Sequence, residues 1–523
     1  MTQIKTPQPV LETTASALQE KKKLRRHFRR FDMFFYLICT VVTIDTIGAV
    51  ASNGAQGFTW LVFLGVFFFL PYAFSIAELG SAFPQEGGPY VWTRLAFGRP
   101  LAAINSVIYW ISNPIWIGGS LTIVSFAAIE EFFGTVGGAW KYVYAVAFIW
   151  FTIGAAVVAL RYGKWVPTLG AWARGAVLGF FVISVIVYAA KHGVHGFGGH
   201  AFLPTYAVFI AVVPVLFFNY AGLEVPSAAG EEMTNPQRDV PFSVLTSGAT
   251  TMLAYGIPIL SILIVLPASQ VSGLTGFLDA VKAVFTVYGG NVAHDGTATL
   301  SGAGLILGRV AAVVFIFALA SAGTTWIMGS DRTEAVASLD GGGPRALGRF
   351  SARFGTPVGM NLLSGVVATV LMIAAFKITG ADSGRYFSAV LGLTISTTTI
   401  SYLFIFPALI KLRYARPDVE RPYRVPGGTA GAWICSAVPT FWALLATVAL
   451  IWPGFGVNWF GGGGNPNDNL DALGFSHERL QYELSQIVPL AVIVGVGVAF
   501  YLLGGKTRRE PAIEPVGHTD PAQ

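Results

Sequence analysis

Four residues that can bend or charge a helix interrupt one apolar stretch of the sequence. Asn219, Gly222, Glu224 and Pro226 fall inside the mostly apolar segment Val213 to Glu232. A carboxylate at bilayer depth costs on the order of 3 kcal/mol. Backbone groups that Gly and Pro release from a helix need partners inside protein or in a wet cavity. We therefore interpret this segment as a broken helix that faces a polar site.

A second interruption lies in the first apolar run, where Asp45 is followed by small residues through Gly54. The two interrupted runs are the first and the sixth. They are five runs apart, and because five is odd, the sixth run would enter the membrane from the side opposite to the first. This arrangement is typical of inverted repeats whose broken helices meet at the midplane. Half-helix N-termini offer amide hydrogens to a carboxylate, and C-termini offer carbonyls to an ammonium group. The pattern predicts a site for a zwitterion.

The composition places these segments in a membrane protein. Hydrophobic residues make up 54% of the 523 residues, charged residues only 11%, and mean hydropathy is +0.62. Such a chain holds about twelve spans of roughly 20 residues and no separate soluble domain. The predicted fold is all-α, with discontinuous helices 1 and 6. The apolar runs lie near 34–56, 58–82, 102–133, 140–160, 168–190, 204–229, 242–266, 305–329, 357–377, 386–412, 433–452 and 485–503.

The distribution of Lys and Arg among the loops predicts the orientation. If the N-terminus is cytoplasmic, 26 of the 33 basic residues lie on the inner side, as expected for loops beside membrane spans. The basic run Lys21 to Arg30 is then a flank of the first helix, and we expect no nucleic-acid partner. The sequence predicts a multi-pass protein of the cell membrane with both termini in the cytoplasm.

Residues for catalysis or metal binding are sparse. Cys39 and Cys435 both lie in or beside apolar spans, so no disulfide framework or Cys-rich metal site is expected. Asp340 to Arg345 lacks the Lys-Ser/Thr of a phosphate loop. His192, His195 and His200 lie in a Gly-rich loop without a supporting carboxylate. We expect no enzyme activity, no cofactor and no metal.

Four stretches together resemble a known family. The chain is similar to the amino acid, polyamine and organocation (APC) transporter superfamily, more particularly to its glutamate:GABA antiporter-like branch. The likeness rests on Asn219 to Glu224 with Gly230 to Pro241, Ala77 to Gly80 with Pro84 to Tyr90, Gly329 to Arg332 with Asp340-Gly341 and Thr356-Pro357, and Arg416 to Gly428.

The resemblance implies a leucine-transporter-type architecture with a five-plus-five inverted repeat. The corresponding segments are a basic cytoplasmic segment (1–33), a ten-helix transport core (34–412), two peripheral transmembrane helices (413–504) and a cytoplasmic tail (505–523). Two features depart from the family. Asp45 to Ala51 replaces a Gly-Ser-Gly type of turn, and the tail after Lys506 is too short for a C-terminal plug.

The substrate-binding residues are expected at the two interruptions and on three further spans. Trp116 could close over a ligand, although Trp facing lipid is equally common, and the hydroxyl groups could simply join helices. The predicted lining consists of Asp45, Thr46, Ile47, Gly48, Asn113, Trp116, Asn219, Tyr220, Ala221, Gly222, Thr324 and Thr398.

Coupling or gating is assigned to four charged residues. Glu224, like Asp45, either carries a proton or pins the broken helices through backbone amides. Arg174 either supplies a fixed charge that repels sodium or snorkels to the interface. Glu231 and Glu78 either form a cytoplasmic gate or belong to an interfacial ion-pair cluster.

We therefore expect a secondary active transporter, a permease that moves amino acids by alternating access, with sodium-independent exchange as its mode. A proton-coupled symporter of amino acids or polyamines shares all these features. A membrane sensor that binds an amino acid without moving it is the alternative from another class. The expected partners are the amino acid and the lipid bilayer, and the sequence leaves a homodimer open.

Overall fold

The structure is a computed structural model that describes residues 13–24, 28–162, 165–194, 196–267, 270–293, 297–378, 383–459, 465–510 and 512–513. Within the basic run, Arg25, Arg26 and His27 lie outside the described residues, as do Lys164 and His195.

Long apolar helices dominate the described part of the chain. Ten helical segments there are long and apolar enough to cross a membrane. Two shorter apolar helices, α11 (Tyr206–Asn219) and the apolar part of α15 (Val358–Ile378), coincide with the sixth and ninth predicted spans. The ten are α2 with α3 (Arg30–Val41, Ile47–Ala51), α4 with α5 (Gly54–Leu64, Leu70–Ala82), α7 with α8 (Arg99–Trp116, Thr122–Phe133), α9 (Ala139–Tyr162), α10 (Trp165–His192), α12 (Pro236–Val265), α14 (Gly302–Leu339), α16 (Ser383–Ala415), α17 (Gly428–Ile451) and α19 (Arg479–Leu503).

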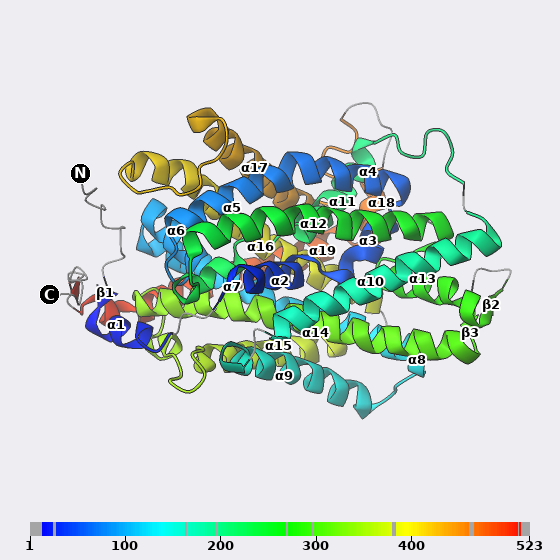
Figure 1. The fold of residues 1–523 in the computed structure, drawn as a ribbon, viewed down its shortest axis with the longest axis horizontal. Helices are drawn as coiled ribbons and strands as arrows, with labels where there is room; N and C mark the ends of the chain where they lie inside the picture. The colour runs from blue at the N-terminus through cyan, green and yellow to red at the C-terminus, as the bar shows by residue number, and fades with distance from the viewer. Residues whose placement is uncertain are drawn as a thin grey trace.

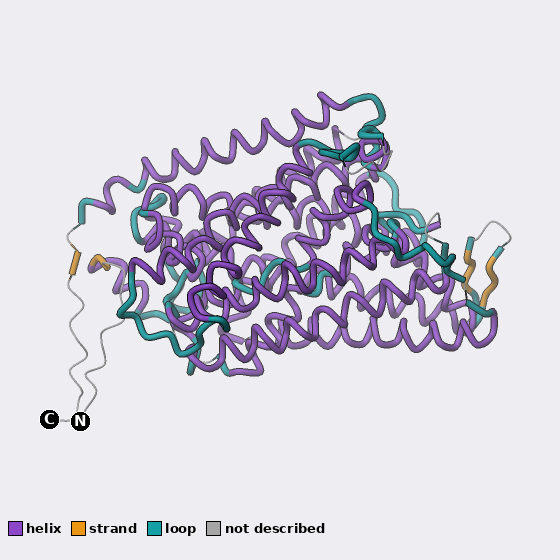
Figure 2. The backbone as a smooth tube through the Cα atoms, turned by 90° about the horizontal axis from the view of Figure 1, so that it is seen from above, coloured by secondary structure: helices purple, strands orange, loops and turns teal. Residues whose placement is uncertain are grey.

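The long helices run side by side along the long axis of the molecule (Figure 1). One end carries α1 (Ala15–Lys21) and α6 (Gly88–Phe97), and the opposite end carries α13 (Gly276–Phe285). The antiparallel pair β2 (Gly290–Val292) and β3 (Ala298–Leu300) lies at the α13 end. Strand β1 (Thr13–Thr14) pairs with β4 (Ala512–Ile513), so segments near both chain termini meet at the α1 end (Figure 2).

The first span is interrupted between α2 and α3. Helix α2 ends at Val41, Thr43 has extended backbone angles (φ −91°, ψ 117°), and a 3₁₀ turn over Ile44–Thr46 precedes α3. The Tyr255 hydroxyl of α12 accepts a hydrogen bond from the Thr43 amide at 2.8 Å and lies 2.8 Å from the Val41 carbonyl oxygen, within donating distance. A buried side chain thus satisfies backbone groups that the helix leaves unpaired.

The sixth span ends its α-helix at Asn219 and continues as a 3₁₀ helix over Val225–Glu232. Between them, Gly222 has φ +114°, a conformation that L side chains rarely adopt. A Cβ atom at Gly222 would lie 2.8 Å from the Trp326 ring. The turn therefore requires glycine for both its backbone angle and its close approach to α14.

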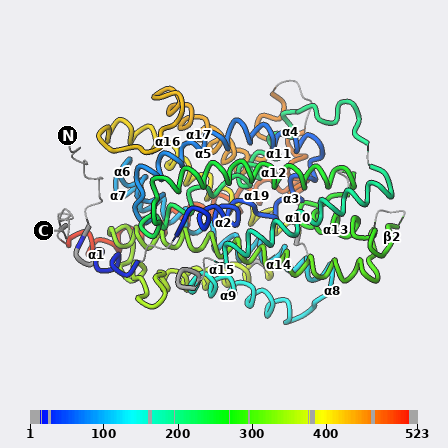
Figure 3. Tube along the Cα trace, in the orientation of Figure 1, coloured from blue at the N-terminus to red at the C-terminus, as the bar shows by residue number. Residues whose placement is uncertain are grey.

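Both interrupted segments lie inside the bundle rather than at its edge. Helix α2 packs against α10, α12 and α14 (Figure 3). Asp45, Asn219 and Glu224 are at most 2% exposed. Burial of three such polar side chains within an apolar helical bundle calls for compensating partners, and the geometry of those partners defines the candidate site.

Candidate functional site

Within the described part of the chain, the Asp45 carboxylate receives two hydrogen bonds on one oxygen and none on the other. The Trp116 indole N–H donates to Asp45 Oδ2 at 3.0 Å, and the Ser120 hydroxyl donates to the same atom at 3.2 Å. Trp116 is the last residue of α7, and Ser120 lies in the π-helical turn Ile117–Leu121 that follows. Asp45 Oδ1 is buried without a partner among the described residues. One carboxylate oxygen is thus open to a donor.

Asn219, at the end of α11, presents a complementary open group. The Thr46 hydroxyl donates to Asn219 Oδ1 at 2.5 Å and so joins the two interrupted spans. The amide nitrogen Nδ2 of Asn219 is buried and has no acceptor among the described residues. An open acceptor on Asp45 and an open donor on Asn219 therefore occur at adjoining interruptions, where each unsatisfied polar group costs about 1–3 kcal/mol.

Aromatic rings surround the indole of Trp116. Its ring centroid lies 5.7 Å from that of Phe218 and 6.3 Å from that of Trp326, and both pairs are edge-to-face. Trp116 is 1% exposed, so it does not face lipid. Rings next to an open carboxylate oxygen suit an ammonium group, which aromatic faces attract.

Three tyrosines enclose the Glu224 carboxylate. Tyr109 on α7 and Tyr402 on α16 each donate to Glu224 Oε1 at 2.8 Å, and Tyr72 on α5 donates to Oε2. The Tyr72 hydroxyl also accepts from the Leu223 amide at 2.8 Å. Glu224 therefore ties the interrupted sixth span to three other helices. This arrangement holds the turn together, and Glu224 is also a buried carboxylate with no basic partner among the described residues.

Arg174 on α10 is 1% exposed and points into the bundle. Its guanidinium donates to the Val42 carbonyl at 2.6 Å, to the Ala318 carbonyl at 2.7 Å and to the Ser321 hydroxyl at 3.0 Å. The alternative in which Arg174 snorkels to the interface is therefore wrong. The side chain instead binds the freed carbonyl at the end of α2 and joins it to α14.

Several other predicted lining residues point to different neighbours. The Tyr220 hydroxyl donates to the Leu61 carbonyl of α4 at 2.9 Å. Gly48 packs against the segment before α13. A Cβ atom at Gly48 would lie 3.0 Å from the Ser272 carbonyl oxygen. Ile47 and Ala221 are buried apolar residues of the two interruptions.

Three predicted polar residues form hydrogen bonds within or between helices. The Asn113 amide contacts the Tyr109 carbonyl of its own helix at 3.4 Å. The Thr324 hydroxyl lies 3.2 Å from the Thr152 carbonyl of α9. The Thr398 hydroxyl donates to the Thr394 carbonyl at 2.9 Å. Their roles in binding stay predictions.

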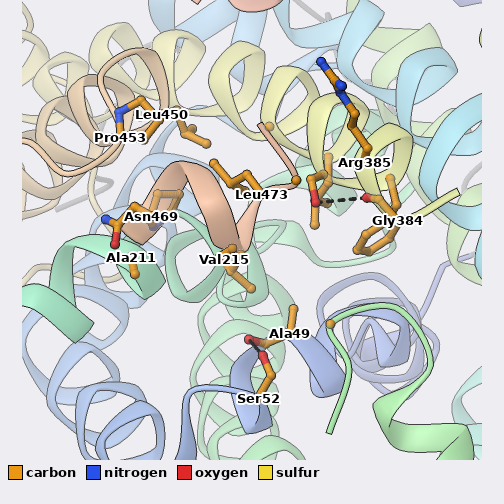
Figure 4. A pocket seen from close by; sticks show the side chains of 18 of the residues that line it. Ala49, Ser52, Ala211, Val215, Gly384, Arg385, Leu450, Pro453, Asn469 and Leu473 are labelled. Atoms are coloured by element: carbon orange, nitrogen blue, oxygen red, sulfur yellow. Dashed lines mark hydrogen bonds between the residues drawn. The ribbon is translucent and has the colours of Figure 1, made fainter. Parts of the chain in front are cut away.

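A cavity of about 440 Å³ lies near the α13 end, since Ser272, Gly273 and Leu274 in the segment before α13 help to line it. Figure 4 shows its walls, which include Ala49 of α3, Val215 of α11 and Arg385 of α16. The short helix α18 (Asp468–Ala472) and the residue after it, Leu473, cover part of this space. Because Ala49 lies about one helical turn after Asp45, the cavity approaches the candidate site from this end.

At the α1 end, ion pairs join several segments. Glu78, at the end of α5, is fully buried and binds the guanidinium groups of Arg413 and Arg421. Glu78 Oε2 also accepts from the Val425 amide at 2.7 Å. Glu231 pairs with Lys21 of α1 at 2.5 Å. The two predicted gating carboxylates therefore belong to two separate ion-pair groups.

Arg332 on α14 forms a third group with two buried carboxylates. It binds Glu86, in the loop before α6, and Glu232 at 3.0 Å. All three side chains are at most 2% exposed. Burial, reinforced by the neighbouring Glu232 charge, raises the pKa of Glu86 to about 8 despite the attraction of Arg332.

Sequence reasoning missed the partners that complete these groups. Tyr72, Tyr109, Tyr402 and Trp326 are aromatic residues within apolar spans, where most aromatic residues only pack. Their position could have indicated this role, because the polar atom of a tyrosine or tryptophan in the middle of a span needs a hydrogen-bond partner. Arg332 lies in a motif that we noted only for its family resemblance.

Comparisons with known proteins point to one family. A family model described as "Amino acid permease" matches residues 28–460. A probable agmatine/putrescine antiporter of Lactococcus lactis is 25% identical over 81% of this chain and 88% of the relative. The glutamate/gamma-aminobutyrate antiporter of the same organism is 22% identical over 78% of this chain and 80% of the relative.

The fold also matches solved structures. The manganese transporter of Eremococcus coleocola, solved with an aromatic bis-isothiourea compound, has a TM-score of 0.55 and 13% identity. The match covers 90% of this chain and 94% of that protein. At this identity the likeness concerns the fold alone.

Proposed function

This chain belongs to the amino acid permease family, and from that premise we propose that it exchanges small primary amines of the amino acid type across the cell membrane without sodium. The observation that carries the proposal is the open pair at the interruptions, Asp45 Oδ1 and Asn219 Nδ2. A substrate ammonium group supplies the donor that Asp45 lacks. A carboxylate or another acceptor on the substrate supplies the partner that Asn219 lacks.

The surroundings of Asp45 favour an ammonium group at this position. Trp116 and Ser120 hold Oδ2 and so fix the orientation of the carboxylate, which leaves Oδ1 to bind the substrate. The adjacent rings of Trp116 and Trp326 add attraction for a cation. The Lactococcus lactis antiporters are described as handling amines and amino acids, all of which carry such a group.

Arg174 supports sodium independence. Its guanidinium occupies the Val42 and Ala318 carbonyls and the Ser321 hydroxyl. These oxygen atoms are the kind of ligand that a hard cation needs, and a fixed positive charge among them repels sodium.

The two ends of the bundle support alternating access. The α13 end has the cavity that approaches Asp45, whereas the α1 end is joined by the ion pairs of Glu78, Glu231 and Arg332. Transport requires these ion pairs to separate while the cavity closes. Since the segments predicted to lie on the inner side carry 26 of the 33 basic residues, and α1 belongs to them, we infer that the α1 end and both termini face the cytoplasm. A homodimer stays a prediction, which crosslinking in native membranes tests.

Glu224 supports a second mode of coupling, proton-linked transport. It is fully buried, it contacts three tyrosine hydroxyls, and no described basic side chain pairs with it. A proton on Glu224 would travel with the conformational change of the sixth span, which makes proton symport the second candidate function.

The deciding experiment uses proteoliposomes. The purified protein is reconstituted into vesicles that are either empty or preloaded with amines and amino acids. Uptake of labelled agmatine, putrescine, glutamate, γ-aminobutyrate and neutral amino acids is then measured in sodium and in choline buffer. Uptake restricted to preloaded vesicles, and equal in both buffers, is the expected result.

Other outcomes separate the alternatives. Uptake into empty vesicles driven by an inward proton gradient would establish symport. A requirement for sodium would contradict the role of Arg174. The Glu130→Gln variant, altered at an exposed residue of α8, serves as a matched carboxylate control and should transport like the parent protein.

A further inference from the structure

Helix α14 continues ten residues beyond the predicted end of the eighth span, from Gly329 to Leu339. This extension carries Asp331, Arg332 and Glu334, and none of them is more than 2% exposed. Arg332 points to Glu86 and Glu232, as described above. Asp331 and Glu334 contact α7 and α15 instead, and no described basic side chain pairs with either.

Asp331 is fully supplied with neutral donors. The Asn361 amide donates to Oδ2 at 2.6 Å, and the Ser364 hydroxyl donates to Oδ1 at 2.8 Å. The Trp110 indole in turn donates to Ser364 at 2.7 Å and fixes that hydroxyl. Both oxygens of Asp331 therefore have a partner without any added group.

Glu334 lacks one donor. The Ser106 hydroxyl donates to Oε2 at 2.6 Å, whereas Oε1 is buried and no described residue pairs with it. The Ser338 hydroxyl also has no partner in the part of the chain that the structure describes, and the residue has no exposed surface. A Cβ atom on Gly343 would lie 3.0 Å from Glu334 Oε1 and 2.5 Å from Ser338 Oγ. The two open oxygens therefore face the same small space.

What this cluster lacks is a positive charge, since the Ser338 hydroxyl can donate to Glu334 Oε1 but no described basic side chain pairs with Glu334. Besides Glu334 Oε1, the amide oxygen of Asn361 is buried without a partner among the residues that the structure describes. An ionised carboxylate left in this position would be costly without a cation or further hydrogen bonds. Asp331 lies about one helical turn before Glu334 on α14, and a negative charge there adds to that cost. A proton on Glu334 removes the charge, and the Ser338 hydroxyl oxygen can then accept a hydrogen bond from the carboxyl group.

Other charged or titratable groups on the packed elements have their own partners. Arg94 on α6 and Arg99 on α7 both bind Asp340, and Tyr90 donates to Asp340 as well. Further groups on the elements around this half of α14 include Tyr36 of α2, Tyr109 of α7, Glu231 and Glu232 of the 3₁₀ helix, Arg345 of the turn after α14 and Arg508 beyond α19, each with a hydrogen bond elsewhere.

We propose that Glu334 is a proton-binding site of this transporter, separate from Glu224, in which the protonated carboxyl group donates to Ser338. The site lies beside the Arg332 ion pairs that close the α1 end. When those pairs separate, water reaches this half of α14, the ionised form of Glu334 is solvated, and the proton leaves on that side. Proton release is thereby tied to the opening of the α1 end, independently of which substrate the central site binds.

The test is infrared difference spectroscopy of the purified full-length protein across a pH titration. The parent protein should show a protonated carboxyl band that loses intensity as the pH rises. Glu334→Gln should lose this band, whereas Glu224→Gln and the exposed control Glu130→Gln should keep it. Ser338→Ala should keep the band but shift its frequency, because the hydrogen-bond acceptor is gone.

Several results would overturn the proposal. An unchanged spectrum in Glu334→Gln would show that Glu334 is ionised. A band that stays constant over the pH range in which the protein is folded would show a permanent, purely structural proton. If Glu334→Gln does not fold, the frequency of the carboxyl band in Ser338→Ala tests the proposal instead. A band at the same frequency as in the parent protein would contradict its assignment to Glu334. None of these readouts requires transport, so the proposal fails separately from the proposed exchange function.

Discussion

The indole N–H of Trp116 donates to the Asp45 carboxylate at 3.0 Å, so the end of α7 orients the charged residue of the interrupted first span. This contact leaves Oδ1 as the open oxygen. It also makes Trp116 part of the polar site rather than a residue that only packs or faces lipid.

Asp45→Asn should weaken substrate binding strongly while the fold persists. The amide is nearly isosteric and can still accept a hydrogen bond from Trp116, but it cannot pair with an ammonium group. Loss of a hydrogen bond to a charged group costs about 1.5–3 kcal/mol, which corresponds to a roughly 10- to 100-fold loss of affinity. Binding of labelled substrates to the detergent-solubilised variant measures the effect, and wild-type affinity in Asp45→Asn would remove Asp45 from the site.

Arg174→Gln should make the protein responsive to sodium. The substitution removes the positive charge and frees the Val42 and Ala318 carbonyls and the Ser321 hydroxyl. We expect a lower melting temperature that sodium raises relative to choline, because an ion that binds the native state stabilises it. The parent protein and Arg238→Gln, altered at an exposed arginine, should melt equally in both salts. Sodium stabilisation of the parent protein would contradict this expectation.

Glu86 should make stability fall as the pH rises. Burial raises the pKa of Glu86 from its usual 4.5 to about 8, so the folded chain binds this proton more tightly than the unfolded chain. The stabilisation is therefore fully present below about 4.5 and is lost as the pH increases toward 8. Melting temperatures of Glu86→Gln should decline less over this window than those of the parent protein. Parallel curves would show that Glu86 is ionised throughout.

Glu78→Gln should destabilise the α1 end. Glu78 is fully buried against Arg413 and Arg421, and removing its charge leaves two guanidinium groups without their counter-ion. Breaking a buried pair in this way costs about 3–5 kcal/mol. The exposed pair of Arg345 and Glu510 offers a matched control, since Glu510→Gln should cost at most about 1 kcal/mol. Equal thermal shifts in the two variants would contradict a special role for Glu78.

The local sequence was sufficient to predict the membrane spans, because length and composition alone decide whether a segment can cross a bilayer. Asp45 and Glu224 stood out for the same reason, since a carboxylate in an apolar span is expensive wherever its neighbours lie. The end of the eighth span was placed too early at Gly329. Charged residues normally mark a span's end, but here Asp331, Arg332 and Glu334 stay buried in the helix.

The sequence by itself therefore determined a multi-spanning helical transporter, its family and the segments that carry the polar site. Only the tertiary structure decided which atoms meet there. Tyr72, Tyr109 and Tyr402 come from three spans to bind Glu224, and Tyr220 points to α4 although its neighbours line the turn. Such pairings depend on how helices distant in sequence pack and rotate against one another, and no local pattern of residues encodes that geometry.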